Sequence, residues 1–342
     1  MSNPLLARYA ECIFWLARQV ERAENLARII EVQETYARNR SGTRDWSSII
    51  QLNSDEKAFA EVHTAPTARN VIRFYVTDGD NPNSIKSAIH YARENARTLR
   101  PLVSTEMWVA LNVFYNQLNA IDDKELAPGS LSPLLDRIKQ ACQGFTGITE
   151  GTFYRDQAWL FYRLGRYLER ADQTTRLLDS KYYVLMRDAD VTNLVNTAEW
   201  LALLRAASGY HAFRLLHQSD LTPWRVAAFL LFNPSFPRSV LLCVKEVDAA
   251  VTGLKSRYNL RGGNDVAEGI DQLRSILGTR SIDEVLASGL HEFIDFIQRY
   301  LMAITDRLGA AFFGHPPVEK SAWQNADLWP AFAADLQTQA QA

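Results

Sequence analysis

Two segments far apart in the chain carry the same pattern of arginines and carboxylates. The members are, in chain order, Arg18, Glu21, Arg22, Glu24, Arg166, Glu169, Arg170 and Asp172. Residues three or four positions apart share one face of a helix, so each set would form one charged face. Arginine is planar and can bind a carboxylate or a phosphate through two hydrogen bonds. The pattern predicts either an ion-pair network between helices or a polar groove for an anionic ligand or a partner protein.

A third charged set lies between these two segments. Its members are Arg93, Glu94, Asn95 and Arg97. Arg93, Arg97 and the nearby Arg100 share a helix face that carries no acid, so we expect a carboxylate from another helix or an anionic ligand beside them. The candidate acids are Glu21, Glu24, Glu169 and Asp172.

The sequence lacks the motifs that several types of reaction require. A di-iron site of the ferritin type requires Glu-x-x-His on helices, and none of the six histidines has an acid three residues before it. Glycine-rich nucleotide loops and the G-x-S-x-G motif are also absent. Flanking arginines would lower the pKa of Glu21 and Glu24, which suits anion pairing better than proton transfer near neutral pH. We therefore predict no metal, no cofactor and no assigned catalytic residue.

Helical periodicity dominates the elements that must position these side chains. A first helix is predicted from the Asn3-Pro4 start to about Arg38, because proline is favoured in the first turn. Further helices are predicted over residues 83–99 and 104–121, and the polar stretch 122–130 reads as a loop. With no alternating strand pattern in the sequence, the fold class is all-α.

Two parts of the sequence also resemble each other. Residues 13–31 align without gaps with residues 161–179, at an offset of 148. Trp46 faces Trp200 at an offset of 154, and Pro82 faces Pro237 at an offset of 155. Three matches in one order predict an internally duplicated helical bundle, in which two multi-helix repeats share one core about a pseudo-twofold axis.

This duplication sets the predicted domain boundaries. They are a first helical repeat over 1–125, a connecting loop and helix over 126–150, a second helical repeat over 151–313 and a C-terminal tail over 314–342. Trp323 and Trp329 in the tail are candidates for docking contacts, since exposed tryptophans often anchor interfaces.

Composition narrows the class of protein. The chain has 342 residues, 47% of them hydrophobic, and a net charge of −2 with no long basic run, so nucleic-acid binding is not expected. Its three cysteines are scattered, which fits a reducing compartment. No apolar stretch approaches the ~20 residues of a membrane span, and no signal peptide is visible. We expect a cytoplasmic protein without a membrane partner, and a homo-oligomer is possible.

Together these segments resemble the bacterial Alpha-E domain family over about residues 5–310. The matching stretches are Phe14-Trp15-x-x-Arg18-x-x-Glu21-Arg22-Ala23-Glu24, Asn81-Pro82-x-Ser84-Ile85, Ala92-Arg93-Glu94-Asn95-Ala96-Arg97, Glu106-x-Trp108-x-x-Leu111-Asn112, Leu164-Gly165-Arg166-Tyr167-Leu168-Glu169-Arg170-Ala171-Asp172 and Pro237-Arg238-Ser239-Val240. One departure is Ala17, where the family more often has the glycine seen at Gly165. It leaves open how closely the first helix approaches its neighbour.

The resemblance implies an all-α domain found beside, or fused to, an ATP-grasp amide ligase and a transglutaminase-like peptidase. The leading hypothesis is a non-catalytic or co-catalytic partner of such a ligase in peptide synthesis or modification, which binds the ligase or an anionic peptide through the charged sets. An enzyme that forms or cleaves amides with Glu21 or Glu169 is the second hypothesis. A purely structural helical scaffold is the third.

Overall fold

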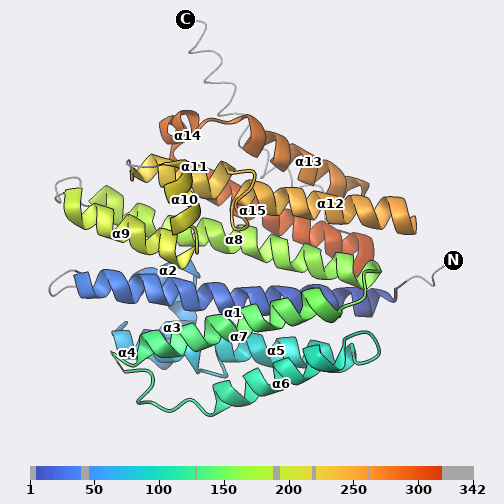
Figure 1. Ribbon diagram of the computed structural model, residues 1–342, viewed down its shortest axis with the longest axis horizontal. Coiled ribbons are helices and arrows are strands. Elements are labelled where there is room, and N and C mark those ends of the chain that lie inside the picture. Colours follow the sequence, from blue (N-terminus) through green and yellow to red (C-terminus); the bar gives the residue numbers. More distant parts are fainter. Residues whose placement is uncertain are drawn as a thin grey trace, which may run out of the picture.

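The chain is helical throughout the part that the computed structural model describes, namely residues 5–39, 46–127, 129–187, 193–217, 221–260 and 262–317. Fifteen α-helices and one π-helical turn occur in these ranges, and no residue within them lies in a β-strand (Figure 1). The all-α prediction is therefore confirmed. None of these helices combines the length and the apolar character that crossing a bilayer requires.

The predicted helix ends agree closely with those in the structure. The three helices predicted to end near residues 38, 99 and 121 are α1, α5 and α6. In chain order the elements are α1 (Ala7–Asn39), α2 (Ser47–Leu52), α3 (Glu56–Val62), α4 (Ala68–Val76), α5 (Ile85–Thr98), α6 (Thr105–Asn119), α7 (Leu131–Thr152), α8 (Gln157–Arg187), α9 (Asn193–Ala206), α10 (Tyr210–Leu216), α11 (Pro223–Phe232), α12 (Val240–Tyr258), α13 (Asn264–Thr279), α14 (Ile282–Ser288), α15 (Leu290–Leu308) and η1 (Gly309–Phe313).

Two long helices, α1 and α8, lie side by side at the centre and run in the same direction (Figure 1). Residues early in α1 contact residues early in α8, and later residues contact later ones. The backbone N–H of Leu5 donates to Gln157, and Arg18 pairs with Glu169. The two backbones lie close together at Gly165, where an added Cβ would lie 2.1 Å from the carbonyl oxygen of Phe14. Only glycine allows the two backbones to meet there.

The remaining long helices cover this central pair in two groups. Helices α5 and α7 pack against α1, and α6 packs across both of them. Helices α12 and α15 pack against α8, and α13 packs across those two. In Figure 1 the first group lies below the central pair and the second group above it. The buried apolar side chains of both groups form one continuous core.

Serine caps start the two helices that flank the central pair. The hydroxyl of Ser84 accepts from the backbone N–H of Ser87 at 3.0 Å, and that of Ser239 accepts from the N–H of Leu242 at 3.2 Å. Each serine satisfies an amide that the helix itself leaves unpaired. Both caps are fully buried, so the starts of α5 and α12 are fixed inside the protein. Trp323 and Trp329 lie outside the described residues.

Candidate functional site

The two predicted charged sets meet across the interface of α1 and α8. The Glu169 carboxylate accepts from Arg18 Nε at 2.7 Å and from Arg22 Nε at 2.7 Å. Gln173, one turn further along α8, donates to the same carboxylate at 3.1 Å. Glu169 is completely buried, and both of its oxygens are held by arginines of the other helix.

Glu21 of α1 is bound in the corresponding way by an arginine of α8. Arg170 donates to both of its oxygens, from Nε at 2.8 Å and from Nη2 at 2.7 Å. Asn25 donates at 2.9 Å from the next turn of α1. Arg166 lies farther away, at 3.9 Å, and instead pairs with Glu150 at 3.1 Å. Each glutamate is thus bound by arginines of the other helix, which forms a reciprocal ion-pair network.

Arginines keep the network ionised despite its burial. Burial alone would raise the pKa of Glu169, but Arg22 and Arg18 overcome it and lower that pKa to about 2. Arg170 and Arg238 likewise hold the pKa of Glu21 far below its ordinary value against the effect of burial. Neither carboxyl group can carry a proton near neutral pH. The hypothesis of acid–base catalysis by Glu21 or Glu169 therefore receives no support from this geometry.

Arg238, at the start of α12, completes the network and was not among the predicted site residues. Its Nη1 donates to Glu21 at 3.1 Å and to Asn25 at 3.0 Å, and its Nη2 donates to Glu24 at 2.5 Å. Burial lowers the pKa of Arg238 to about 10, with Glu24 and Glu21 opposing the change. The sequence signal that could have identified Arg238 is its position between Pro237 and Ser239, in the second copy of the repeated Pro-x-Ser sequence.

Glu24 and Asp172 each bind an arginine one turn ahead on their own helix. Glu24 accepts from Arg28 Nη2 at 2.5 Å, and Asp172 accepts from Arg176 Nε at 2.8 Å. Arg28 also donates to the carbonyl oxygen of Ala206 and to the Ser208 hydroxyl at 2.9 Å. Sequence reasoning did not select Arg28 or Arg176 as site residues, although Arg28 is repeated as Arg176 in the self-alignment.

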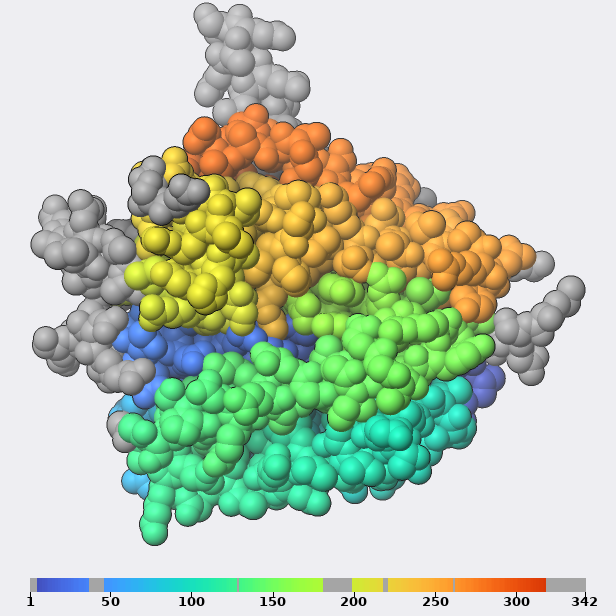
Figure 2. Space-filling view, viewed as in Figure 1, coloured from blue at the N-terminus to red at the C-terminus, as the bar shows by residue number. Residues whose placement is uncertain are grey.

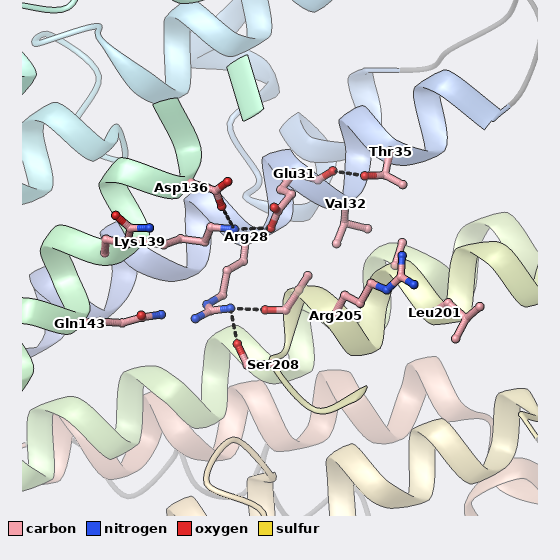
Figure 3. Close-up of a pocket in the computed structure, with 13 residues that line it drawn as sticks. Arg28, Glu31, Val32, Thr35, Asp136, Lys139, Gln143, Leu201, Arg205 and Ser208 are labelled. Carbon is pink, nitrogen blue, oxygen red and sulfur yellow. Dashed lines mark hydrogen bonds and ion pairs between the residues drawn. The ribbon is translucent and has the colours of Figure 1, made fainter. Parts of the chain in front are cut away.

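An open pocket of about 580 Å³ lies beside the buried side chain of Arg28. It is lined by α1, α7, α9 and the turn after α9, and in Figure 2 the α1 surface shows in the hollow between α7 and α9. Figure 3 shows Lys139 of α7 between two acids, at 2.7 Å from Glu31 and 2.9 Å from Asp136. Arg205 of α9 is exposed, and no described residue forms an ion pair with it.

The third predicted set lies elsewhere, on the surface formed by α5 and α6. Arg93 donates to Asn112 at 2.7 Å and pairs with Glu94 at 3.0 Å, while Arg97 pairs with Glu94 at 2.7 Å. Our expectation of a carboxylate from another helix is wrong for Arg93 and Arg97. A local acid reaches both arginines, because long side chains bend toward neighbours on adjoining faces.

The surroundings of this third set are polar and aromatic. The Arg93 guanidinium lies 5.5 Å from the Trp108 ring and 5.0 Å from the Tyr115 ring, and Arg100 lies 5.2 Å from Trp108. Asn95 is half-buried on the same helix. The structure therefore joins eight of the predicted site residues in the central network and leaves Arg93, Glu94, Asn95 and Arg97 as a separate surface cluster.

Within the described ranges, no three His, Cys, Asp or Glu side chains gather as a metal site would require. Burial raises the pKa of Cys142 and Cys243, so both thiols stay protonated. The chemistry that the central network shows is charge pairing between buried carboxylates and arginines.

Comparisons with known proteins agree with the helical character of this chain. A family model, Alpha-E, described as a predicted α-helical domain with a conserved ER motif, matches residues 5–313. Glu-Arg occurs twice in this sequence, at Glu21-Arg22 and Glu169-Arg170, and both pairs are in the central network.

Two mycobacterial relatives extend this match. The uncharacterized proteins Mb2597 of Mycobacterium bovis and Rv2567 of Mycobacterium tuberculosis are each 22% identical to this chain over 91% of its length. The chain spans 37% of the length of these relatives. No solved structure matches it. With a family model covering nearly all of the described residues, this chain belongs to the Alpha-E family.

Proposed function

We propose that the protein is a non-catalytic or co-catalytic partner of an ATP-grasp-type amide ligase, and that it binds the ligase or an anionic peptide of a peptide-synthesis or peptide-modification reaction. The observation that carries this proposal is the open pocket at Arg28, Lys139 and Arg205. Its volume of about 580 Å³ lies in the range of ordinary ligand sites.

The charges in this pocket favour a carboxylate ligand. Arg28 and Lys139 are already bound to acids of the protein, which fixes them in position. Arg205 has an exposed guanidinium that stacks on Tyr210 at 5.5 Å and forms no ion pair with a described residue. A carboxylate bound at Arg205 would gain a charge-assisted hydrogen bond without displacing an existing ion pair.

The lengths of the relatives support a role beside another protein. In the mycobacterial proteins the matching region forms 37% of a longer chain, so the same unit exists there joined to further sequence. The family resemblance implies that an ATP-grasp ligase supplies the nucleotide chemistry. In this protein the central network would hold the scaffold, and the pocket would supply the recognition surface.

The test measures ATP turnover by the purified, co-encoded ATP-grasp protein with and without this chain. The chain should raise turnover or product yield, and Arg205→Ala should reduce the stimulation about 10- to 100-fold, since it removes a charge-assisted contact of roughly 1.5–3 kcal/mol. Arg214→Ala is the matched control, because Arg214 is exposed on α10 outside the pocket. Circular dichroism should show the same helix content in both variants.

Two results would contradict the proposal. They are full activity of the ligase without this chain, and conversion of a peptide with ATP by the purified chain alone. A loss confined to the double change Arg93→Ala with Arg97→Ala would instead place the ligase contact on the α5–α6 surface cluster and remove the pocket from the proposal.

We also propose that the chain is an internal duplication with repeats at 1–125 and 151–313. Support comes from contacts that recur at the offsets found in the sequence. Arg28 donates to the carbonyl oxygen of Ala206, and Arg176 donates to that of Leu52 at 2.8 Å. The ring pair Phe59–Phe74 has a counterpart in Phe213–Phe229, both nearly perpendicular.

This duplication is tested by an experimentally determined structure. Superposing residues of about 5–100 on about 153–255 should align at least three helices in the same order, with Arg18 on Arg166 and Glu21 on Glu169. A different helix order in the two segments would refute it.

A further inference from the structure

The outward side of α6 carries almost no charge. No charged residue lies between Glu106 and Asp122, although α6 lies at the outer edge of its helix group (Figure 1). Val109 and Val113 stand one turn apart on this side and are each 50% exposed. Asn116 continues the same row and is exposed as well. Water therefore meets a row of apolar and amide side chains where the outer face of a helix ordinarily carries charges.

The equivalent helix of the second group shows that the fold does not require an uncharged row. Helix α13 packs across α12 and α15 as α6 packs across α5 and α7. The buried side chains of the two helices share one spacing, at Met107, Leu111, Phe114 and Leu118 of α6 and at Val266, Ile270, Leu273 and Leu277 of α13. In this register the exposed Glu268 and Gln272 take the places of Val109 and Val113.

Arginines lie along one edge of the uncharged row. Arg93, Arg97 and Arg100 follow one another at helical spacing on α5 and just after its end. Glu94 is the only described carboxylate that pairs with Arg93 or Arg97, and Arg100 is exposed and forms no ion pair with a described residue. Even with Glu106 of the first turn of α6 included, this edge keeps an excess of positive charge on a chain whose net charge is −2.

An aromatic ring joins the arginine edge to the uncharged row. The Trp108 ring lies 5.5 Å from the guanidinium of Arg93 and 5.2 Å from that of Arg100. Trp108 directly precedes Val109 on α6, so both features belong to one surface, which we call the α5–α6 surface.

The corresponding surface of the second group neutralises its own charges. Asp248 follows the cap Ser239 of α12 at the distance at which Arg93 follows the cap Ser84 of α5. It pairs with Arg274 of α13 at 3.6 Å. The α5–α6 surface therefore differs from its counterpart both in its excess positive charge and in its exposed apolar row.

We propose that the α5–α6 surface binds an amphipathic α-helix of another polypeptide, with the apolar side of that helix on Val109 and Val113 and with acidic residues along the edge that faces Arg97 and Arg100. Charge complementarity selects acids for this edge, because Arg100 has no carboxylate among the described residues and Arg97 shares its own with Arg93. Helices that bind in this way present apolar residues at intervals of three and four positions.

Size and symmetry favour a single helix over a second copy of this chain. Helix α6 has 15 residues and is therefore about 22 Å long, whereas a stable interface between folded proteins takes about 20–30 residues from each side. A twofold contact through this surface would also present the same arginine edge in place of acids. The surface is separate from the pocket beside Arg28, and the inference does not depend on the proposed function.

The test measures the binding of two synthetic, helix-stapled peptides of about 20 residues to the full chain by fluorescence anisotropy. Both peptides carry leucines along one side, and the edge of the leucine row carries glutamates in one peptide and lysines in the other. The glutamate peptide should bind with a Kd below about 100 μM and at least about tenfold more tightly than the lysine peptide. Amide hydrogen exchange in the complex should slow in α6.

Charge reversal tests the arginine edge. Arg97→Glu combined with Arg100→Glu should reverse the preference between the two peptides, because the edge then repels glutamate. Lys255→Glu combined with Arg257→Glu is the matched control, since Lys255 holds the position after Ser239 that Arg100 holds after Ser84. This control should keep the preference of the unaltered protein.

Val109→Glu tests the apolar row. The fold accepts glutamate at the equivalent position of α13, so circular dichroism should stay unchanged while the affinity for the glutamate peptide falls at least about tenfold. Leu286→Glu makes the same kind of change at an exposed position of α14 and should bind as the unaltered protein does.

Four results would overturn the proposal. They are the absence of binding or equal binding of the two peptides, and an unchanged preference in the variant with both arginines reversed. A single-stranded oligothymidylate that competes with the glutamate peptide would mark the surface as a nucleic-acid site. A dimer of the chain that Val109→Glu dissociates in analytical ultracentrifugation would assign the surface to self-association.

Discussion

A glutamate enclosed by protein keeps its charge only while its arginines stay in place. Glu21 and Glu169 are 3% and 0% exposed, and each depends on arginines of the neighbouring helix. Desolvation opposes the charged form, and ion pairing at 2.7–2.8 Å overcomes it. The network thus behaves as one unit, in which the loss of one member leaves buried charge behind.

Replacing Glu21 by alanine should destabilise the protein strongly. Arg170 would lose its carboxylate and Arg238 one of its two carboxylates while both arginines remain buried, and such losses cost about 3–5 kcal/mol. Urea unfolding followed by circular dichroism measures the change. Glu61→Ala, at an exposed position of α3, should alter the free energy of unfolding by less than about 0.5 kcal/mol. A loss below about 1 kcal/mol for Glu21→Ala would mean that water screens the pair.

Stability should also fall in acid. The pKa of Glu169 is about 2 in the folded protein and 4.5 in its ordinary state, so the unfolded chain takes up protons first as pH falls. The stabilisation is complete above about pH 4.5 and is lost between pH 4.5 and 2. Burial raises the pKa of Asp55 and Asp179, which acts in the opposite sense. Urea midpoints at pH 7 and 3 should differ less in Glu169→Gln than in the unaltered protein.

Predictions for single residues agreed with the structure where the sequence repeat pointed to the ion-pair partners. They failed where the partners are set by tertiary packing. The repeated Arg and Glu pattern predicted either an ion-pair network between helices or a polar groove, and in the structure Glu21 and Glu169 each bind arginines of the other central helix. Arg238 lies 217 residues from Glu21, and no local pattern links positions so distant. Arg93 was assigned by helix face alone, whereas its long side chain reaches the adjacent Glu94.

At the scale of elements, local signals were sufficient. Helix ends depend on caps and prolines within a few residues, so α1, α5 and α6 appear close to their predicted bounds. How closely helices approach one another depends on residues in both. The glycine noted at Gly165 marks the place where α8 touches the backbone of α1, and nothing in its own segment identifies Phe14 as its neighbour.

Gly165→Ala should therefore destabilise the protein, although alanine favours a helix. The added Cβ would lie 2.1 Å from the Phe14 carbonyl oxygen, and separating two packed backbones costs about 1–3 kcal/mol. Gly147→Ala is the matched control on α7, because no atom lies within 4 Å of its added Cβ. That change should stabilise by up to about 1 kcal/mol. Equal effects of the two changes in thermal unfolding would contradict the close approach.

For the whole molecule, the central pair makes the two helix groups depend on each other. The core is continuous across both groups, and the carboxylates of each central helix are neutralised by the other. A cut in the connection between α7 and α8 should yield fragments that remain unstructured separately and regain helical circular dichroism on mixing. Two fragments that each unfold cooperatively when alone would show that the groups are independent domains.

The exchange of charges between α1 and α8 also constrains the order of events during synthesis. Arg18 leaves the ribosome 151 residues before Glu169, which at about 5–20 residues per second is a delay of roughly 8–30 s. Until then α1 has no carboxylate from α8 to neutralise its arginines, and burying them would be unfavourable. The arginines of α1 must therefore stay hydrated in the nascent N-terminal part, and α1 becomes fully buried only after α8 has been synthesised.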